Sequence, residues 1–388
     1  MKKLFVVLVT VSLLVSCSAS EKRSGYAKPM AKVDVMREIA SSGTVRPADF
    51  SGKNLSDLDL PQTNFRGANL KGAYFRNSNI TESNFRNADL SGANLRQTKL
   101  AGSLLAGANL SGANLQDADL RGAVLDEADL SNANLRNAKL DRASLRNINL
   151  AGATLTDASL EKAYLGDSNL SGVDMRKVNL TGADLYGTIL RGTNFEGTNL
   201  RSVDLSHTDL SGANLQRADL TYANLQNALL FGADFHQATM DKCDLRGANA
   251  YRTSFVSASL RGAQFRGANI SEANFSDTDA REASMYEVTA THASFTWSNL
   301  SKAIMRKSDF SSANFSNATL VDANLKESKL AFAKLVSANF SGSDMRDVDF
   351  ASADVSGANL KNTNMRGAKN THTIIGLDRA LHLDKSLL

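Results

Sequence analysis

The sequence predicts an all-β solenoid, because apolar residues return every five positions through most of the chain. From Leu55 to Met365, almost every residue whose number divides by five is apolar, usually Leu or Phe, and the residue two places earlier is usually Ala. No insertion breaks this register. A period held this long indicates one continuous repeat array, not the two or three globular domains that 388 residues would ordinarily form.

Each five-residue unit is predicted to be a short extended segment followed by a turn. In the unit Ala108-Asn109-Leu110-Ser111-Gly112, Ala and Leu occupy alternate positions and face one side, while Asn faces the other. Such a segment buries nothing alone, but segments stacked about 4.8 Å apart enclose an apolar column and pair their backbones. The three prolines, Pro29, Pro47 and Pro61, lie before or at the entrance of the array, so later units keep every backbone N–H.

These units resemble the pentapeptide-repeat family. The resemblance runs through residues 51–368. It implies a right-handed quadrilateral β-helix with four repeats in each coil. At that rate the array would have about sixteen coils and form a rod about 75 Å long.

Short helical caps are expected at both ends, because terminal coils otherwise expose apolar side chains and unpaired strand edges. The N-terminal cap is predicted in residues 31–50 and the C-terminal cap in residues 369–388. Both segments leave the five-residue period and place apolar residues at helical spacing. These residues are Val33, Met36, Ile39 and Ala40 in the first cap, and Leu377, Ala380 and Leu381 in the second.

The beginning of the chain predicts export and lipid anchoring. Lys2-Lys3 precedes an apolar run that is too short to span a bilayer as a helix. Leu14-Val15-Ser16-Cys17 then resembles the lipobox of bacterial lipoproteins, which implies removal of residues 1–16 and lipidation of Cys17. Residues 17–30 would form a flexible tether. A plain secretory signal with an incidental cysteine is the alternative.

The sequence offers no constellation for catalysis. With positions twenty apart lying one coil apart, His207, His236 and His292 fall on different faces, and no pair is placed for a metal or for a nucleophile with its base. We therefore expect no enzyme activity, no cofactor and no metal. Cys243 replaces Ala at an inward slot and is expected to be a buried, inert thiol.

Folding the sequence at a period of twenty gives a basic column on one face. Its members are Arg246, Arg266, Arg306, Lys326, Arg346 and Arg366. Such a column would suit an anionic polymer or lipid surface. The alternative is a solvated face with local neutralisation, since acidic residues flank the column.

A second candidate surface consists of apolar residues at slots that face outward. These residues are Ile189, Leu229, Phe231 and Tyr251. Together they would form an interaction patch, with a homodimer contact as one use. Stacked aromatic residues that only stabilise the coils are the alternative.

Three central slots hold Ala in place of Leu or Phe, which predicts the least stable coils between residues 250 and 290. These are Ala250, Ala280 and Ala290. Loss of a large core side chain costs roughly 2 to 5 kcal/mol when nothing fills the space. The alternative is that Phe255, Phe265 and Phe275 fill the volume.

The leading hypothesis is a non-enzymatic, lipid-anchored rod at the bacterial envelope, on the outer membrane facing the periplasm or the cell surface. It would be a rigid scaffold for an envelope protein or an anionic polymer. The best-known members of the family it resembles imitate DNA and bind gyrase, protecting it from quinolones, and this is the first alternative. It requires a strongly acidic surface, whereas the net charge is +4, or about +2 without Lys2 and Lys3, so no nucleic-acid partner is expected either. An envelope carbohydrate-binding β-helix is the second alternative.

Overall fold

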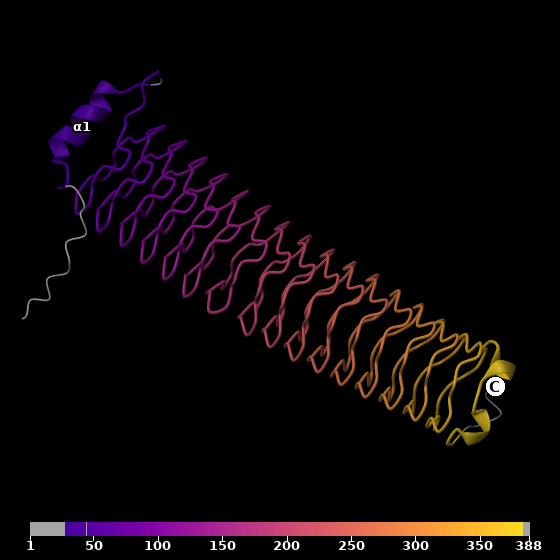
Figure 1. Cartoon of the computed structure of the whole chain (residues 1–388). Coiled ribbons are helices and arrows are strands. Elements are labelled where there is room, and N and C mark those ends of the chain that lie inside the picture. The colour runs from indigo at the N-terminus through magenta and orange to yellow at the C-terminus, as the bar shows by residue number, and fades with distance from the viewer. Residues whose placement is uncertain (1–27, 44, 383–388) are drawn as a thin grey trace, which may run out of the picture.

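The computed structural model describes residues 28–43 and 45–382. These residues form a long rod of stacked coils with helix α1, Lys32–Ser41, at its N-terminal end (Figure 1). Two 3-10 helices, η1 (Thr371–Thr373) and η2 (Leu377–Arg379), lie at the other end. The predicted export signal and Cys17 fall outside the described residues. Within the described ranges, no helix is both long enough and apolar enough to cross a membrane.

Four repeats make one coil. Parallel bridges join residues twenty positions apart, from Asp49 and Asn69 near the N-terminus to Asp349 and Lys369 near the C-terminus. Each side of a coil contributes one bridging residue, so the described chain contains isolated bridges and no longer strands. The predicted right-handed quadrilateral β-helix is confirmed.

The core consists of the two inward residues of each repeat. Leucine or phenylalanine at the central slot is almost completely buried along the rod, as is the small residue two places earlier. Five phenylalanines from successive coils form one stacked ladder, with ring centroids 5.2, 4.6, 4.9 and 4.7 Å apart. This Phe ladder consists of Phe235, Phe255, Phe275, Phe295 and Phe315.

The Phe ladder passes through the coils in which alanine occupies a central slot. Ala250, Ala280 and Ala290 are fully buried. Phe265, two repeats away and therefore on the opposite side of the coil, meets Phe255 and Phe275 edge-on at 6.1 and 5.8 Å. The coils with the smallest central residues therefore contain a concentration of buried rings.

A positive φ at the second turn position explains the residue types found there. Many of these positions hold Gly, and the other residues in them have φ of 52–62°. Among the described residues with positive φ there is no Val, Ile or Thr. A β-branched side chain clashes in the left-handed region, whereas Gly, Asn and Asp tolerate it.

The Asn or Asp before the central residue closes the turn with its side chain. In a representative repeat, Asn109 Oδ1 accepts hydrogen bonds from the Ser111 N–H at 3.0 Å and the Ser111 hydroxyl at 2.7 Å. The short acceptor satisfies an amide that would otherwise point into solvent. This contact recurs along the rod and explains why Asn or Asp so often stands directly before the central residue.

Helix α1 covers the first coils with a face different from the predicted one. Val35 is fully buried and Ile39 packs against the core, whereas Val33 and Met36 are 60% and 44% exposed. The prediction that Val33 and Met36 face the core was wrong. Val35 and Ile39 are four residues apart and so lie on the same side of the helix.

The C-terminal end continues as a widened coil. Ile375 bridges to Asp354 and Leu381 bridges to Asn359, at separations of 21 and 22 residues instead of twenty. The 3-10 helices η1 and η2 accommodate the extra residues in the corners. Leu377 and Leu381 therefore do not share the face of one helix.

Candidate interaction surfaces

Three of the four predicted apolar residues meet on one side of the rod. Leu229 and Phe231 flank the buried Leu230 and are 46% and 49% exposed. The Phe231 ring stacks on Tyr251 of the next coil, with centroids 5.9 Å apart and planes 24° from parallel. We call Leu229, Phe231 and Tyr251 the aromatic patch.

A charged pair borders the aromatic patch. The Tyr251 hydroxyl donates to Glu272 Oε1 at 2.7 Å, and Arg252 Nε pairs with Glu272 Oε2 at 2.7 Å. Donation to this carboxylate raises the pKa of Tyr251 and lowers the pKa of Glu272. Tyr251 is thereby held in place at the edge of the patch.

Ile189 does not touch the aromatic patch. It bridges to Asp209, which in turn bridges to Leu229, so one coil separates the two apolar side chains. Asp209 in that coil pairs with Arg191 at 2.5 Å. The structure therefore places an ion pair between Ile189 and the other three residues.

One aromatic contact near Ile189 was not predicted. Tyr186 is 45% exposed and its ring lies 5.3 Å from that of His207. The two residues are twenty-one apart, so they occupy successive coils at one corner. Searching the columns for aromatic residues at separations of twenty and twenty-one would have found them.

The basic column is largely neutralised. Four of its six members lie beside a carboxylate: Arg246 with Asp244 (2.6 Å), Arg346 with Asp344 (2.6 Å), Lys326 with Glu327 (3.2 Å) and Arg266 with Glu287 (3.6 Å). Within the described residues, Arg306 and Arg366 form no ion pair. The Arg306 guanidinium lies 5.6 Å from the Tyr286 ring centroid. The Arg266 guanidinium, in addition to its ion pair, lies 5.2 Å from the same centroid. Unpaired positive charge on this column is therefore restricted to two separated positions.

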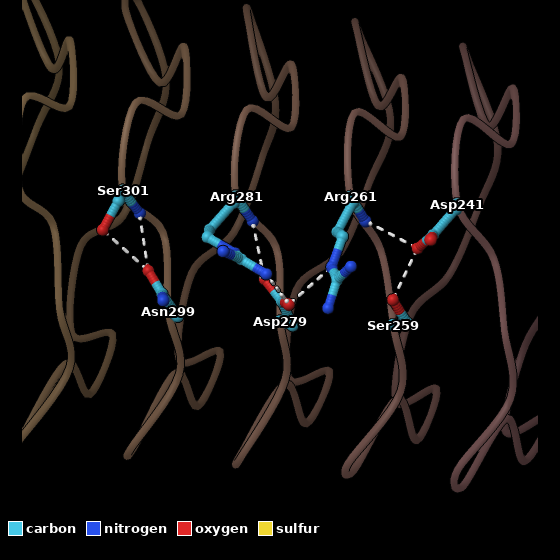
Figure 2. Close-up of polar contacts among 7 residues, drawn as sticks. All are labelled: Asp241, Ser259, Arg261, Asp279, Arg281, Asn299 and Ser301. Carbon is cyan, nitrogen blue, oxygen red and sulfur yellow. Dashed lines mark hydrogen bonds and ion pairs between the residues drawn. The ribbon is translucent and has the colours of Figure 1, made fainter.

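A third surface, which sequence reasoning did not find, carries a polar network across successive coils (Figure 2). Asp279 accepts hydrogen bonds from Arg281 Nε at 2.8 Å and from Arg261 Nε, one coil away, at 2.7 Å. The hydrogen bond from Arg281 is the main cause that lowers the pKa of Asp279 to about 2. One carboxylate thus links the arginines of two coils.

The same network shows how Asp replaces a missing turn acceptor. Ser259 stands where Asn or Asp usually closes the turn. Asp241, in the preceding coil, accepts hydrogen bonds from the Ser259 hydroxyl at 2.5 Å and from the Arg261 N–H at 3.1 Å (Figure 2). Asp126 and Asp141 do the same for the serines eighteen residues later. The sequence signal is a serine in the Asn/Asp slot with Asp eighteen residues earlier.

Acid is expected to weaken the rod at Asp279. The folded-state pKa of about 2 lies below the ordinary 3.8, so the ion pairs stabilise the fold fully above about pH 4 and lose this contribution as the pH falls toward 2. The Asp279 side chain is 26% exposed, and solvent screening limits the effect to about 1 kcal/mol. Melting temperatures of the wild type and Asp279→Asn, measured from pH 5 to 2, should converge as the pH falls. Parallel curves would contradict this assignment.

The described residues show no group of three or more His, Cys, Asp or Glu side chains placed to hold a metal ion. Burial raises the pKa of the Cys243 thiol far above its ordinary range. A groove of about 570 Å³ near the N-terminal end is lined mainly by amide and guanidinium side chains, with Asp57 as its one carboxylate among the lining residues. The paired carboxylates of a carbohydrate-processing site are not found in that groove.

Comparison with protein-family models agrees with the five-residue repeat that builds the coils. A family model described as pentapeptide repeats matches overlapping segments within residues 48–367. A search of curated proteins gave no match. Among solved structures, HetL is 26% identical, with 79% of this chain and 93% of HetL covered and a TM-score of 0.19. HetL is a pentapeptide repeat protein involved in heterocyst differentiation regulation from the cyanobacterium Nostoc sp. strain PCC 7120.

QnrB1, a plasmid-mediated fluoroquinolone resistance protein, is 24% identical to this chain. The alignment covers 44% of this chain and 90% of QnrB1, with a TM-score of 0.26. A pentapeptide repeat protein from the Arabidopsis thaliana thylakoid lumen is 22% identical, with 43% of this chain and 71% of that protein covered and a TM-score of 0.13.

Proposed function

The chain belongs to the pentapeptide-repeat family, and from that premise we propose that it is a non-enzymatic, lipid-anchored scaffold of the bacterial cell envelope. The basic pair Lys2-Lys3, the apolar run and the Leu14-Val15-Ser16-Cys17 motif support export and anchoring through lipid on Cys17. The rod supports a scaffold role, because it presents side chains at a constant spacing along one axis.

The observation that carries the proposal is the aromatic patch. Its centre is apolar, and Glu272 and Arg252 form a charged border. Protein interfaces combine an apolar, aromatic-rich centre with a polar rim in this way. The proposed partner is therefore an envelope protein with an apolar surface of its own. An anionic polymer suits this chain less well, because four members of the basic column already have carboxylate neighbours.

The gyrase-binding alternative has less support from charge. A DNA mimic needs carboxylates that remain unpaired over a long surface. Here Asp119, Asp174, Asp244, Asp279 and Asp344 each pair with the arginine two residues later. The sequence has 40 acidic residues against 44 basic ones, so no acidic excess exists to imitate a nucleic acid.

Substitution within the aromatic patch tests the proposed partner contact. We expect Phe231→Ser/Tyr251→Ser to reduce affinity for an envelope partner, isolated after crosslinking in cells and then purified, at least about tenfold. The control is Trp297→Ser/Phe332→Ser, because those side chains are 66% and 64% exposed at other places on the rod. Calorimetric titration of the purified partner would give both affinities. Equal affinity of the two double variants would contradict the proposal, and so would the absence of any discrete partner.

A further inference from the structure

The backbone ladder is interrupted near the middle of the rod. Between segments 177–183 and 196–204, both within the described residues, several amides lack the backbone acceptor that their slot normally has. They are the amides of Lys177, Leu180, Gly182, Asn199 and Asp204. We call the interface between these two segments the seam.

The same slots are fully bonded three coils further along. There the Gln237, Met240 and Lys242 amides donate to the next coil at 3.0, 2.7 and 2.8 Å. Asn179 and Asn199 also form no β-bridge with each other, whereas Asn199 forms the usual bridge with Asp219 in the next coil. The loss continues around the corner to the coil below, where the Leu155 and Asp157 amides, also in the described chain, lack their usual acceptors.

Side-chain packing at the seam is looser than in most of the rod, in addition to the missing backbone hydrogen bonds. A shallow groove of about 530 Å³ lies along it, with Val178, Thr198 and Arg217 among the lining residues. Val178, Ala183 and Thr198 are 4%, 3% and 3% exposed, whereas most core residues of the rod are at 0 or 1%. Figure 1 shows a wider step between two successive coils in the magenta part of the rod.

Bulky residues at the small inward slot give a physical cause. This slot usually holds Ala or Ser, but seven of the eight slots from 173 to 208 hold a β-branched residue. They are Val173, Val178, Thr188, Thr193, Thr198, Val203 and Thr208. Val178 and Thr198 occupy the same column in successive coils. Extra volume in a closely packed core shifts the backbone. The stacked pairs Val173/Thr193 and Thr188/Thr208 keep their backbone bonds, so the separation of two coils is specific to the Val178/Thr198 pair.

We infer that the seam is a built-in opening point that divides the rod into two stiff halves. Coils before residue 150 and from residue 205 to 350 keep their full ladder, so local separation at the seam breaks fewer hydrogen bonds than separation in those coils. The aromatic patch lies on the C-terminal side of the seam and helix α1 on the N-terminal side. Opening therefore changes the orientation of the patch relative to the N-terminal end.

Hydrogen exchange on the full chain, resolved to single amides by mass spectrometry, tests the opening. Amides within 177–204 should exchange at least about tenfold faster than those at equivalent slots within 217–244. The acceleration should include the Val178 and Ala183 amides, which donate within their own turns. Their acceleration distinguishes opening from the mere absence of a partner. Rates within threefold of the equivalent slots would overturn the inference.

Two double variants test the cause. Val178→Ala/Thr198→Ala should slow exchange at the seam toward the rate of the flanking coils. Ala118→Val/Ala138→Thr places the same pair in the same column further toward the N-terminus, and it should create a second fast-exchanging region within 117–144. The second variant keeps the test informative if the first does not fold. Unchanged exchange in a folded variant of either kind would contradict the packing explanation.

Discussion

Phe275→Ala is expected to destabilise the surrounding coils by about 3 to 5 kcal/mol, with the upper part of this range more appropriate here. Phe275 is fully buried and stacks between Phe255 at 4.6 Å and Phe295 at 4.9 Å. The next central slot in the chain already holds Ala280, so the adjoining side that follows Phe275 has no large residue that could move into the cavity. The substitution therefore removes the transfer energy of the ring and leaves much of its volume empty.

Local hydrogen exchange between residues 255 and 300 measures this loss better than one global midpoint, because long repeat arrays do not always unfold in a single step. Phe275→Leu restores much of the volume and should cost less than about 1.5 kcal/mol. Phe332→Ala is the surface control, since Phe332 is 64% exposed. A loss below about 1 kcal/mol for Phe275→Ala would show that the Phe ladder does not support these coils.

Leu215→Asp is expected to disrupt the rod by at least about 4 kcal/mol, because it places a carboxylate in the apolar column with no partner. Leu215 is fully buried. A buried charge either stays ionised at high cost or takes up a proton, and both outcomes destabilise the native coil. We expect a lowered melting temperature by circular dichroism, or failure to accumulate as folded protein.

Asn214→Asp is the matched control, because the same side chain is introduced one residue earlier and on the outer face. Asn214 Oδ1 accepts the Gln216 N–H at 3.1 Å, and a carboxylate keeps this acceptor. Its effect should remain within about 0.5 kcal/mol. Similar losses for the two variants would contradict the alternation of inward and outward residues that defines every side of the rod.

Most of the fold could be predicted because every repeat has the same pattern of residue types. Each repeat has two inward residues, one turn acceptor and one residue that tolerates positive φ, and no insertion interrupts this order. A wrong assignment at one residue therefore does not change the assignment of the next repeat. Helix α1 lacks such repetition. Its apolar residues Val33, Val35, Met36 and Ile39 allow more than one buried face, and contact with the first coil selects Val35 and Ile39.

The candidate surfaces could be predicted only where they depend on the period of twenty. That period brings Leu229, Phe231 and Tyr251 together, but it does not show that Asp209 and Arg191 separate them from Ile189. Side-chain pairing depends on rotamers, so the five Asp–Arg pairs within repeats and the carboxylate of Asp279 shared by two coils became visible only in three dimensions. The seam depends on the summed volume of residues in stacked slots, which inspection of single repeats does not reveal.

Metabolic labelling with palmitate, combined with fractionation of membranes, tests the proposed anchored scaffold most directly. We predict label on the wild type, recovery of the wild type in an envelope fraction, and neither for Cys17→Ala. Folding of the variant can be checked by circular dichroism, because Cys17 precedes the first coil. Unlabelled wild-type protein in the cytosol would contradict the anchor and would favour the gyrase-binding alternative.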